Sequence, residues 1–149
     1  MKGKKKHIKV LYISYDGITD PLGSSQVLPY ILRLSEKGVD ITLLSFEKEK
    51  NYNKNNEYVA QLLENAGISW VSENYTKYPP VLSTFYDVYK MKKTASGLHK
   101  EKAFDIIHCR SYIASLVGLK LKNKTGVKFL FDMRGFWADE RVEGGLWNL

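Results

Sequence analysis

The sequence predicts an α/β fold, a three-layer α/β/α sandwich with a mainly parallel sheet. Short apolar runs alternate with amphipathic runs along nearly the whole chain, which is typical of strands that alternate with helices. The second of these apolar runs is hydrophobic on both faces, as expected for a parallel strand that helices cover on both sides. The 149 residues are enough for one domain with its own core, and right-handed crossovers between the strands then follow.

The first expected strand, 8–14, is a buried apolar run, and the first expected helix is the amphipathic run 25–37. Gly38 is a natural stop for that helix. Pro29 belongs near the start of the helix, because a proline deeper inside would remove a hydrogen bond and clash with the preceding turn. We therefore expect an irregular first turn at 23–28.

The second expected strand, 40–46, is the run that is apolar on both faces. The polar run 47–56 is predicted to be a loop, and 56–66 a helix that Gly67 ends. The third strand is expected at 68–71.

The second half of the chain continues the alternation. The stiff Pro79–Pro80 dipeptide favours a loop at 72–80. The elements expected after it are a helix at 82–100, a strand at 105–108, a tight loop at 109–111, a helix at 112–122 and a strand at 127–133. The tail, 134–149, is dense in charged and aromatic residues and contains no complete element.

Composition narrows the class of protein. No run of about 18 apolar residues exists, so no transmembrane helix is expected, and the apolar stretch near the basic N-terminus is too short for a signal peptide. A single cysteine gives no disulfide framework and suits a cytoplasmic protein. The net charge of +7 and its lysine clusters favour nucleic acid, anionic membrane or phosphorylated ligands as partners. A lysine-rich face that only aids solubility is the alternative.

The segment 14–27 joins the first strand to the first helix and suits an anion, because the first N–H groups of a helix have no internal partner and the helix dipole favours negative charge there. We expect Gly17, Gly23, Ser24 and Ser25 to form a phosphate site, with Gly23 allowing a ligand to approach the backbone closely. The segment is neither GxGxxG nor a Walker A sequence, so by itself the signal is weak.

Other cofactor patterns are missing from the sequence. Glu47 follows the second strand, where a nicotinamide site would have an acid, but the missing glycine triplet argues against that cofactor. Cys109 lacks the surroundings of a nucleophile. No CxxC, HExxH or cluster with metal-ligand spacing occurs, so no metal site is expected.

Candidate catalytic residues lie at or just after the carboxyl ends of the expected strands, because ligands of an open parallel sheet bind beyond those ends. These candidates are Asp16, Arg110, Asp132 and Arg134. Each has a structural alternative: Asp16 suits an Asx-turn or a helix cap, and Asp132 suits a simple ion pair with either arginine. His108, at the same edge, is either a ligand contact or a packed side chain.

Two segments together resemble the N-terminal domain of family 4 glycosyltransferases, which have the GT-B fold. They are DGITDPLGSSQVLPYILRLSEKGVDITLLSFEK and FDIIHCRSYIASLVGLKL…FLFDMRGFWADERVEGG, and the second is the more specific. The resemblance covers the chain from about Ile8 onward. It implies a Rossmann-like domain of a retaining, hexosyltransferase-type enzyme that moves a sugar from a nucleotide-sugar to a glycan or lipid-linked acceptor without a metal. Surface polysaccharide or glycoconjugate synthesis is the expected setting.

The resemblance also implies roles for the candidate residues. The glycine loop, with Gly23 to Ser25, reaches the donor diphosphate, and Arg110 and Arg134 stabilise the leaving diphosphate. Asp132 orients Arg134 or accepts from a sugar hydroxyl, and Asp16 holds an acceptor hydroxyl. The family's second domain, which carries paired glutamates and most of the donor site, is expected outside residues 1–149. Residues 1–149 alone are therefore expected to be inactive.

The basic helix expected at 82–100 suggests a peripheral contact with the anionic inner face of a membrane. Its candidate contact residues are Lys90, Lys92, Lys93 and Lys100, beside Tyr86, Tyr89 and Met91. Two other hypotheses remain open. One is a stand-alone Rossmann-like domain that binds a nucleotide or phosphate without catalysis. The other, nucleic-acid binding, lacks any recognisable module.

Overall fold

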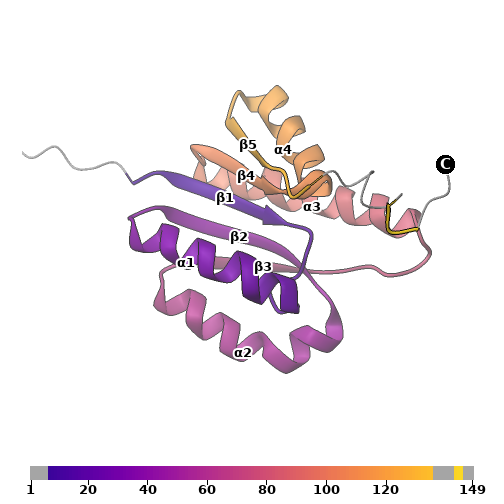
Figure 1. Cartoon of the computed structure of the whole chain (residues 1–149). Helices are drawn as coiled ribbons and strands as arrows, with labels where there is room; N and C mark the ends of the chain where they lie inside the picture. The colour runs from indigo at the N-terminus through magenta and orange to yellow at the C-terminus, as the bar shows by residue number, and fades with distance from the viewer. Residues whose placement is uncertain (1–6, 136–142, 146–149) are drawn as a thin grey trace, which may run out of the picture.

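The computed structural model describes residues 7–135 and 143–145 and forms one parallel sheet with helices on both faces (Figure 1). The strands are β1 (Lys9–Ser14), β2 (Asp40–Glu47), β3 (Ser69–Asn74), β4 (Ile106–Arg110) and β5 (Lys128–Asp132). The helices are the π-helical turn η1 (Gly23–Val27), α1 (Leu28–Glu36), α2 (Glu49–Asn65), α3 (Leu82–Lys102) and α4 (Ser111–Thr125). All four strand pairings are parallel, in the order β3-β2-β1-β4-β5.

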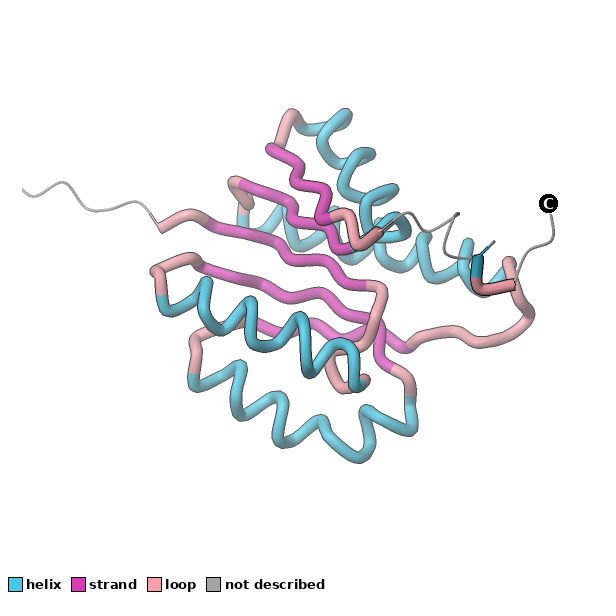
Figure 2. The backbone as a smooth tube through the Cα atoms, viewed as in Figure 1, coloured by secondary structure: helices cyan, strands magenta, loops and turns pink. Residues whose placement is uncertain are grey.

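Two apolar cores lie on opposite faces of the sheet because side chains alternate along each strand. From β1, Tyr12 packs with α1 and α2 on one face, whereas Leu11 and Ile13 pack with α3 and α4 on the other. Figure 2 shows the helices on the two sides of the strands. The chain therefore has a Rossmann-like α/β fold, and the predicted fold class is confirmed.

The strand order reverses between β1 and β4. The chain runs from β1 outward to β3, then returns to place β4 against the other side of β1. The register pairs Ser14 with Arg110 at the carboxyl ends of these two strands. Loops that leave neighbouring strands in opposite directions open a crevice at such a point, which is where this class of fold binds ligands.

The predicted loop at 47–56 is wrong, because α2 already begins at Glu49. The early part of α2 is held by polar contacts to the segment after β1. Asn51 Nδ2 donates to Asp20 Oδ1 at 2.5 Å, and Asn55 Nδ2 donates to the carbonyl of Thr19 at 3.2 Å. The polar side of this part of α2 therefore packs against the segment after β1. The pattern of apolar residues in the sequence does not reveal such a polar contact.

Several boundaries also differ from the expectations. β3 runs to Asn74 instead of ending at 71. Cys109 and Arg110 belong to β4 instead of a tight loop, and α4 follows at once at Ser111, whose φ is 65°. The expected irregular first turn is confirmed, because the π-helical η1 leads directly into α1.

Most of the predicted tail, 134–149, lies outside the described residues. Within the residues that the structure describes, no helix is both long enough and apolar enough to cross a membrane.

Candidate functional site

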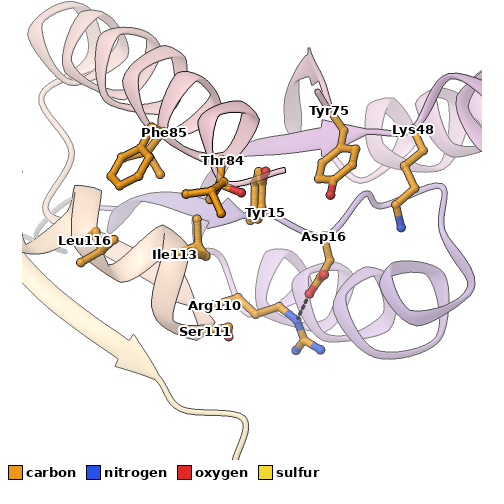
Figure 3. A pocket seen from close by; sticks show the side chains of 12 residues that line it. Tyr15, Asp16, Lys48, Tyr75, Thr84, Phe85, Arg110, Ser111, Ile113 and Leu116 are labelled. Carbon is orange, nitrogen blue, oxygen red and sulfur yellow. Dashed lines mark ion pairs between the residues drawn. The ribbon is translucent and has the colours of Figure 1, made fainter. Parts of the chain in front are cut away.

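A pocket of about 620 Å³ lies beyond the carboxyl ends of β1 and β4 and against α3 and α4 (Figure 3). One part of its lining is polar or charged and comes from the strand ends: Tyr15, Asp16, Lys48, Arg110 and Ser111. The other part is mainly apolar and comes chiefly from the helices: Tyr75, Val81, Thr84, Phe85, Val88, Ile113 and Leu116. The pocket therefore suits a molecule with a polar end and an apolar end.

Arg110 lies at the polar end and is 3% exposed. Its Nη2 donates to Gln26 Oε1 of η1 at 2.6 Å, and its Nε lies 3.7 Å from Asp16 Oδ2, the ion pair drawn in Figure 3. Neither Nε nor Nη1 has a hydrogen-bond partner among the described residues. A buried cation with two unused donors is costly, and an anionic ligand would satisfy it.

The N-terminus of α4 adds to the positive character of this end. Arg110 is the N-cap residue of α4, and no side chain caps the free N–H groups of the first turn. The helix dipole places partial positive charge at the same terminus. Arg110 and the start of α4 together favour an anion such as a phosphate.

Asp132 and Arg134 form a second ion pair at the end of β5, the strand next to β4. Arg134 Nη2 lies 3.3 Å from Asp132 Oδ2. The same carboxylate oxygen lies 3.8 Å from Nε2 of His108 on the neighbouring strand. The structure thus brings Asp16 to Arg110 and Asp132 to Arg134, but Asp132 and Arg134 do not line the pocket.

His108 is a packed side chain in this structure. It is buried between Tyr12 and Tyr30, with ring centroids 4.5 and 5.8 Å away. Burial lowers its pKa below the ordinary 6.5, and the nearby Asp132 opposes that shift only in part. The neutral imidazole is therefore favoured, which agrees with the packed alternative. Cys109, on the other face of β4, is also buried, and burial raises the pKa of its thiol to about 12.

The glycines of the segment after β1 allow backbone to approach backbone. A Cβ at Gly23 would lie 2.0 Å from the carbonyl oxygen of Gly17, and one at Gly17 would lie 2.8 Å from Glu47 Oε2. Gly23 is itself buried. Both glycines are thus required for the packing of this segment, whatever ligand it holds.

Both predicted phosphate-binding serines use their hydroxyl groups within this segment. Ser24 Oγ donates to the carbonyl of Ile18 at 2.9 Å, and Ser25 Oγ donates to the carbonyl of Leu22 at 3.3 Å. The Ser24 N–H donates to the carbonyl of Asp20 at 2.9 Å and is therefore not free in this conformation. Phosphate binding by Gly17, Gly23, Ser24 and Ser25 stays a prediction.

Glu47 fixes the shape of the segment after β1. Its buried carboxylate accepts hydrogen bonds from the N–H groups of Ile18 and Thr19, and from the hydroxyls of Thr19 and Ser45. Four donors occupy the carboxylate, so it is not available to a ribose. Sequence reasoning missed this anchoring role. The signal that could have indicated it is the position of an acidic residue at the end of a strand that is apolar on both faces.

Asp87 is a second buried acid that sequence reasoning missed. It is fully buried on α3 and accepts from Tyr15 Oη at 3.0 Å and from the Thr76 N–H at 2.9 Å. Its other oxygen lies 3.0 Å from Lys90 Nζ. Burial, together with Asp87, raises the pKa of Tyr15 above its ordinary value, so the phenol stays protonated. These contacts hold α3 against β1 and shape the pocket wall.

Among the residues that the structure describes, no group of three His, Cys, Asp or Glu side chains is placed to hold a metal ion. The chemical features of the site are therefore the cationic end around Arg110 and the apolar wall of α3 and α4. Lys48 lies at the same end, with its ammonium 2.7 Å from Asp20 Oδ2.

Comparison with solved structures finds the same fold in proteins of different function. The C-terminal domain of a hydrogenase from Pyrococcus furiosus is 18% identical, with a TM-score of 0.64 over 85% of this chain and 91% of that one. At this identity the likeness shows the fold alone, which is Rossmann-like. A glycosyltransferase from Rickettsia africae is 15% identical, with a TM-score of 0.56 over 85% of this chain and 29% of that one. The glycotransferase of kitacinnamycin is 12% identical, with a TM-score of 0.60 over 93% of this chain and 34% of that one.

No protein-family model matches the chain, and comparison with curated proteins finds no significant relative. The chain spans about a third of the length of the glycosyltransferases that it matches. At these identities a structural likeness shows the fold alone. The chemistry of the site therefore follows from the residues of this chain.

Proposed function

We propose that this chain is the N-terminal, acceptor-side domain of a retaining glycosyltransferase that uses a nucleotide-sugar. The observation that carries the proposal is the buried Arg110, with two donors that the described residues leave without a partner, at the end of a pocket large enough for a substrate. The glycosyltransferase neighbours and the resemblance of the two sequence segments to family 4 support it.

In this proposal the cationic end of the pocket binds the diphosphate of the donor. Negative charge grows on the leaving oxygen as the bond from the sugar to the diphosphate breaks. Arg110 Nε and Nη1, with the N–H groups at the start of α4, stabilise that charge once Asp16 has left Nε. Asp16 moves from Arg110 toward an acceptor hydroxyl when the anion arrives. Its side chain, about half exposed, has room to do so.

Asp132 and Arg134 serve the neighbouring part of the same edge. Asp132 holds the Arg134 guanidinium in place, and Arg134 contributes a second positive charge toward the leaving diphosphate. The rest of the nucleotide-sugar is held by a second domain outside residues 1–149, which agrees with the share of the neighbouring glycosyltransferases that this chain spans. The acceptor is a glycan or a lipid-linked molecule of surface polysaccharide or glycoconjugate synthesis, at the cytoplasmic side of a membrane.

The test is sugar transfer by the longer protein that contains this chain, with a panel of labelled nucleotide-sugars. We expect transfer by the longer protein, negligible transfer by residues 1–149 alone, and a reduction of about 100-fold in turnover in Arg134→Ala. Arg33→Met, on the exposed side of α1, is the control and should leave turnover unchanged. Turnover by residues 1–149 equal to that of the longer protein would contradict the two-domain proposal. Unchanged kinetics in Arg134→Ala would remove Arg134 from the mechanism.

A stand-alone domain that binds a nucleotide or phosphate is the second candidate function. The observation that favours it is that Arg110, Gln26 and the start of α4 all come from this one chain. Tight nucleotide binding by residues 1–149, without transfer by any longer form, would favour this candidate over the transferase.

A further inference from the structure

The side chain of Gln26 makes the hydrogen bond that holds the Arg110 guanidinium. Its Oε1 accepts from Arg110 Nη2 at 2.6 Å. Among the described residues, the other two guanidinium nitrogens, Nε and Nη1, have no hydrogen-bond partner. Asp16 Oδ2 lies 3.7 Å from Nε, which is close enough for an ion pair but too far for a hydrogen bond. The direction in which the guanidinium points therefore depends chiefly on Gln26.

The irregular start of the first helix brings Gln26 to this place. η1 is a π-helical turn, in which the Leu28 N–H donates to the carbonyl of Gly23, five residues earlier. Gly23 is buried and lets this turn lie against the backbone of Gly17, where a Cβ would clash. The turn buries Val27, and its neighbour Gln26 reaches the end of β4. Single π-helical turns inside helices are frequent at functional sites.

A second contact, one helical turn later, fixes the register between α1 and β4. Tyr30 packs edge-on against His108, with ring centroids 5.8 Å apart. Gln26 and Tyr30 are four residues apart in a helical segment, about 6 Å along its axis. His108 and Arg110 are two residues apart in a strand, about 6.6 Å, and point to the same face. Because the two spacings match, the packing of Tyr30 on His108 also places Gln26 beside Arg110.

A glutamine is a weaker partner for a buried arginine than an acid would be. A carboxylate would form a charge-assisted hydrogen bond and would compensate the buried positive charge. Gln26 accepts the same hydrogen bond without adding negative charge. The acid that does approach Arg110, Asp16, is about half exposed, so an incoming anion can displace it into water. Asp132, opposite Arg110 in the strand register, lies beside Arg134. The guanidinium is thus held in place while its charge stays available to an anion.

We propose that Gln26 is a positioning residue for the anion site: it orients Arg110 toward a bound phosphate group and keeps fixed negative charge away from that site. The inference rests on the proposed function, because it concerns the same diphosphate site. The structural alternative is that Gln26 only ties η1 to the sheet. Two substitutions separate these roles. Gln26→Glu keeps the shape and the hydrogen bond but adds a fixed charge, whereas Gln26→Leu removes the hydrogen bond at a similar side-chain size.

The first experiment titrates residues 1–149 with inorganic pyrophosphate by calorimetry and follows the thermal unfolding of each variant. We expect Gln26→Glu to keep or raise Tm, because the new carboxylate pairs with the buried guanidinium. The same substitution should weaken pyrophosphate binding at least about fivefold, because like charges repel. Gln26→Leu should weaken binding and also lower Tm, because a third guanidinium donor loses its partner. The matched control is Gln61→Glu, which adds the same charge at an exposed position of α2 and should change neither quantity.

NMR of the arginine side chains measures the orientation itself. The sequence has four arginines, so isotope-labelled arginine gives few side-chain signals, and Arg110→Met identifies those of Arg110. We expect separate Nη signals for Arg110 in the parent and in Gln26→Glu, where the hydrogen bond at Nη2 slows rotation of the guanidinium. We expect one averaged signal in Gln26→Leu.

Three results would overturn the positioning role of Gln26 although the parent binds pyrophosphate. They are unchanged affinity in either Gln26 variant, a fall in Tm of Gln26→Glu that accompanies its loss of affinity, and averaged Nη signals of Arg110 in the parent. No binding of pyrophosphate by the parent would overturn the anion site at Arg110 itself, and the positioning role with it. Failure of the positioning role alone is therefore distinguishable from failure of the proposed function.

Discussion

Arg110 is buried at a cost to the fold that the proposed anion site would explain. The guanidinium is buried, yet the described structure gives it one hydrogen bond, to Gln26, and one distant ion pair, to Asp16. A side chain selected for stability alone would satisfy its donors or be apolar. A bound anion would give Nε and Nη1 the hydrogen-bond partners that the described residues do not supply.

Replacing Arg110 by methionine should therefore stabilise the chain. Replacing a whole buried ion pair by apolar side chains is often neutral or stabilising by about 1–4 kcal/mol, and here the partner that is left behind, Asp16, is about half exposed and stays hydrated. We expect Tm to rise by roughly 2–4 °C for each kcal/mol gained in a domain of this size. Differential scanning calorimetry measures the change, with the exposed Arg33→Met as the matched control. A marked fall in Tm for Arg110→Met would show that Arg110 is a structural residue.

His108 should make stability fall in mild acid. Burial lowers its pKa in the folded chain below the ordinary 6.5, so below that pH the unfolded chain binds a proton that the folded chain resists. The stability is therefore present above about pH 6.5 and is lost as the pH falls through the lower, folded pKa. Melts from about pH 7.5 to about pH 5.5 should show a smaller loss of Tm in His108→Phe than in the parent. Leu119→Phe, at an exposed position of α4, should keep the parent's slope, and an unchanged slope in His108→Phe would refute the assignment.

At the scale of elements, the segment between β1 and α1 is held from two sides. Glu47 binds its backbone and side-chain donors from the end of β2, and Lys48 and Asn51 bind Asp20 from the start of α2. Three elements thus meet where β1 ends, beside Arg110. This packing explains why the segment contains glycines although it matches no phosphate-binding motif.

Gly23→Ala tests this packing directly. The added methyl group would meet the carbonyl of Gly17 at 2.0 Å, and backbone cannot move aside cheaply. We expect a loss of about 3 kcal/mol in the free energy of unfolding. Gly97→Ala, in the interior of α3 with no atom within 4 Å of the new Cβ, should gain about 0.5–1 kcal/mol. Urea titration measures the free energy of unfolding of the two variants. Equal changes in Gly23→Ala and Gly97→Ala would contradict the close packing of Gly23 against Gly17.

At the scale of the whole molecule, the sheet and its helices were predictable because their apolar residues recur with the period of each element. β1, β2, α1 and α4 follow that pattern closely. The first part of α2 was not predictable, because Asn51 and Asn55 face a polar loop and not an apolar core. The burial of Glu47 and Asp87 was hidden for the same reason, since long-range donors decide where an acid can be buried.

The candidate site was predictable in part. The carboxyl ends of parallel strands meet at one edge of the sheet. Topology alone therefore predicted that Asp16 lies near Arg110 and Asp132 near Arg134. The unused donors of Arg110 and the apolar wall from α3 were not visible, because they depend on side-chain packing across elements distant in sequence.

Calorimetric titration of residues 1–149 with a nucleoside diphosphate and with inorganic pyrophosphate measures anion binding at Arg110. We expect both to bind near Arg110, and we expect Arg110→Met to weaken both at least tenfold, about 1.4 kcal/mol, while Arg33→Met does not. Equal affinity in the parent and Arg110→Met, or no binding by the parent, would contradict an anion site at Arg110.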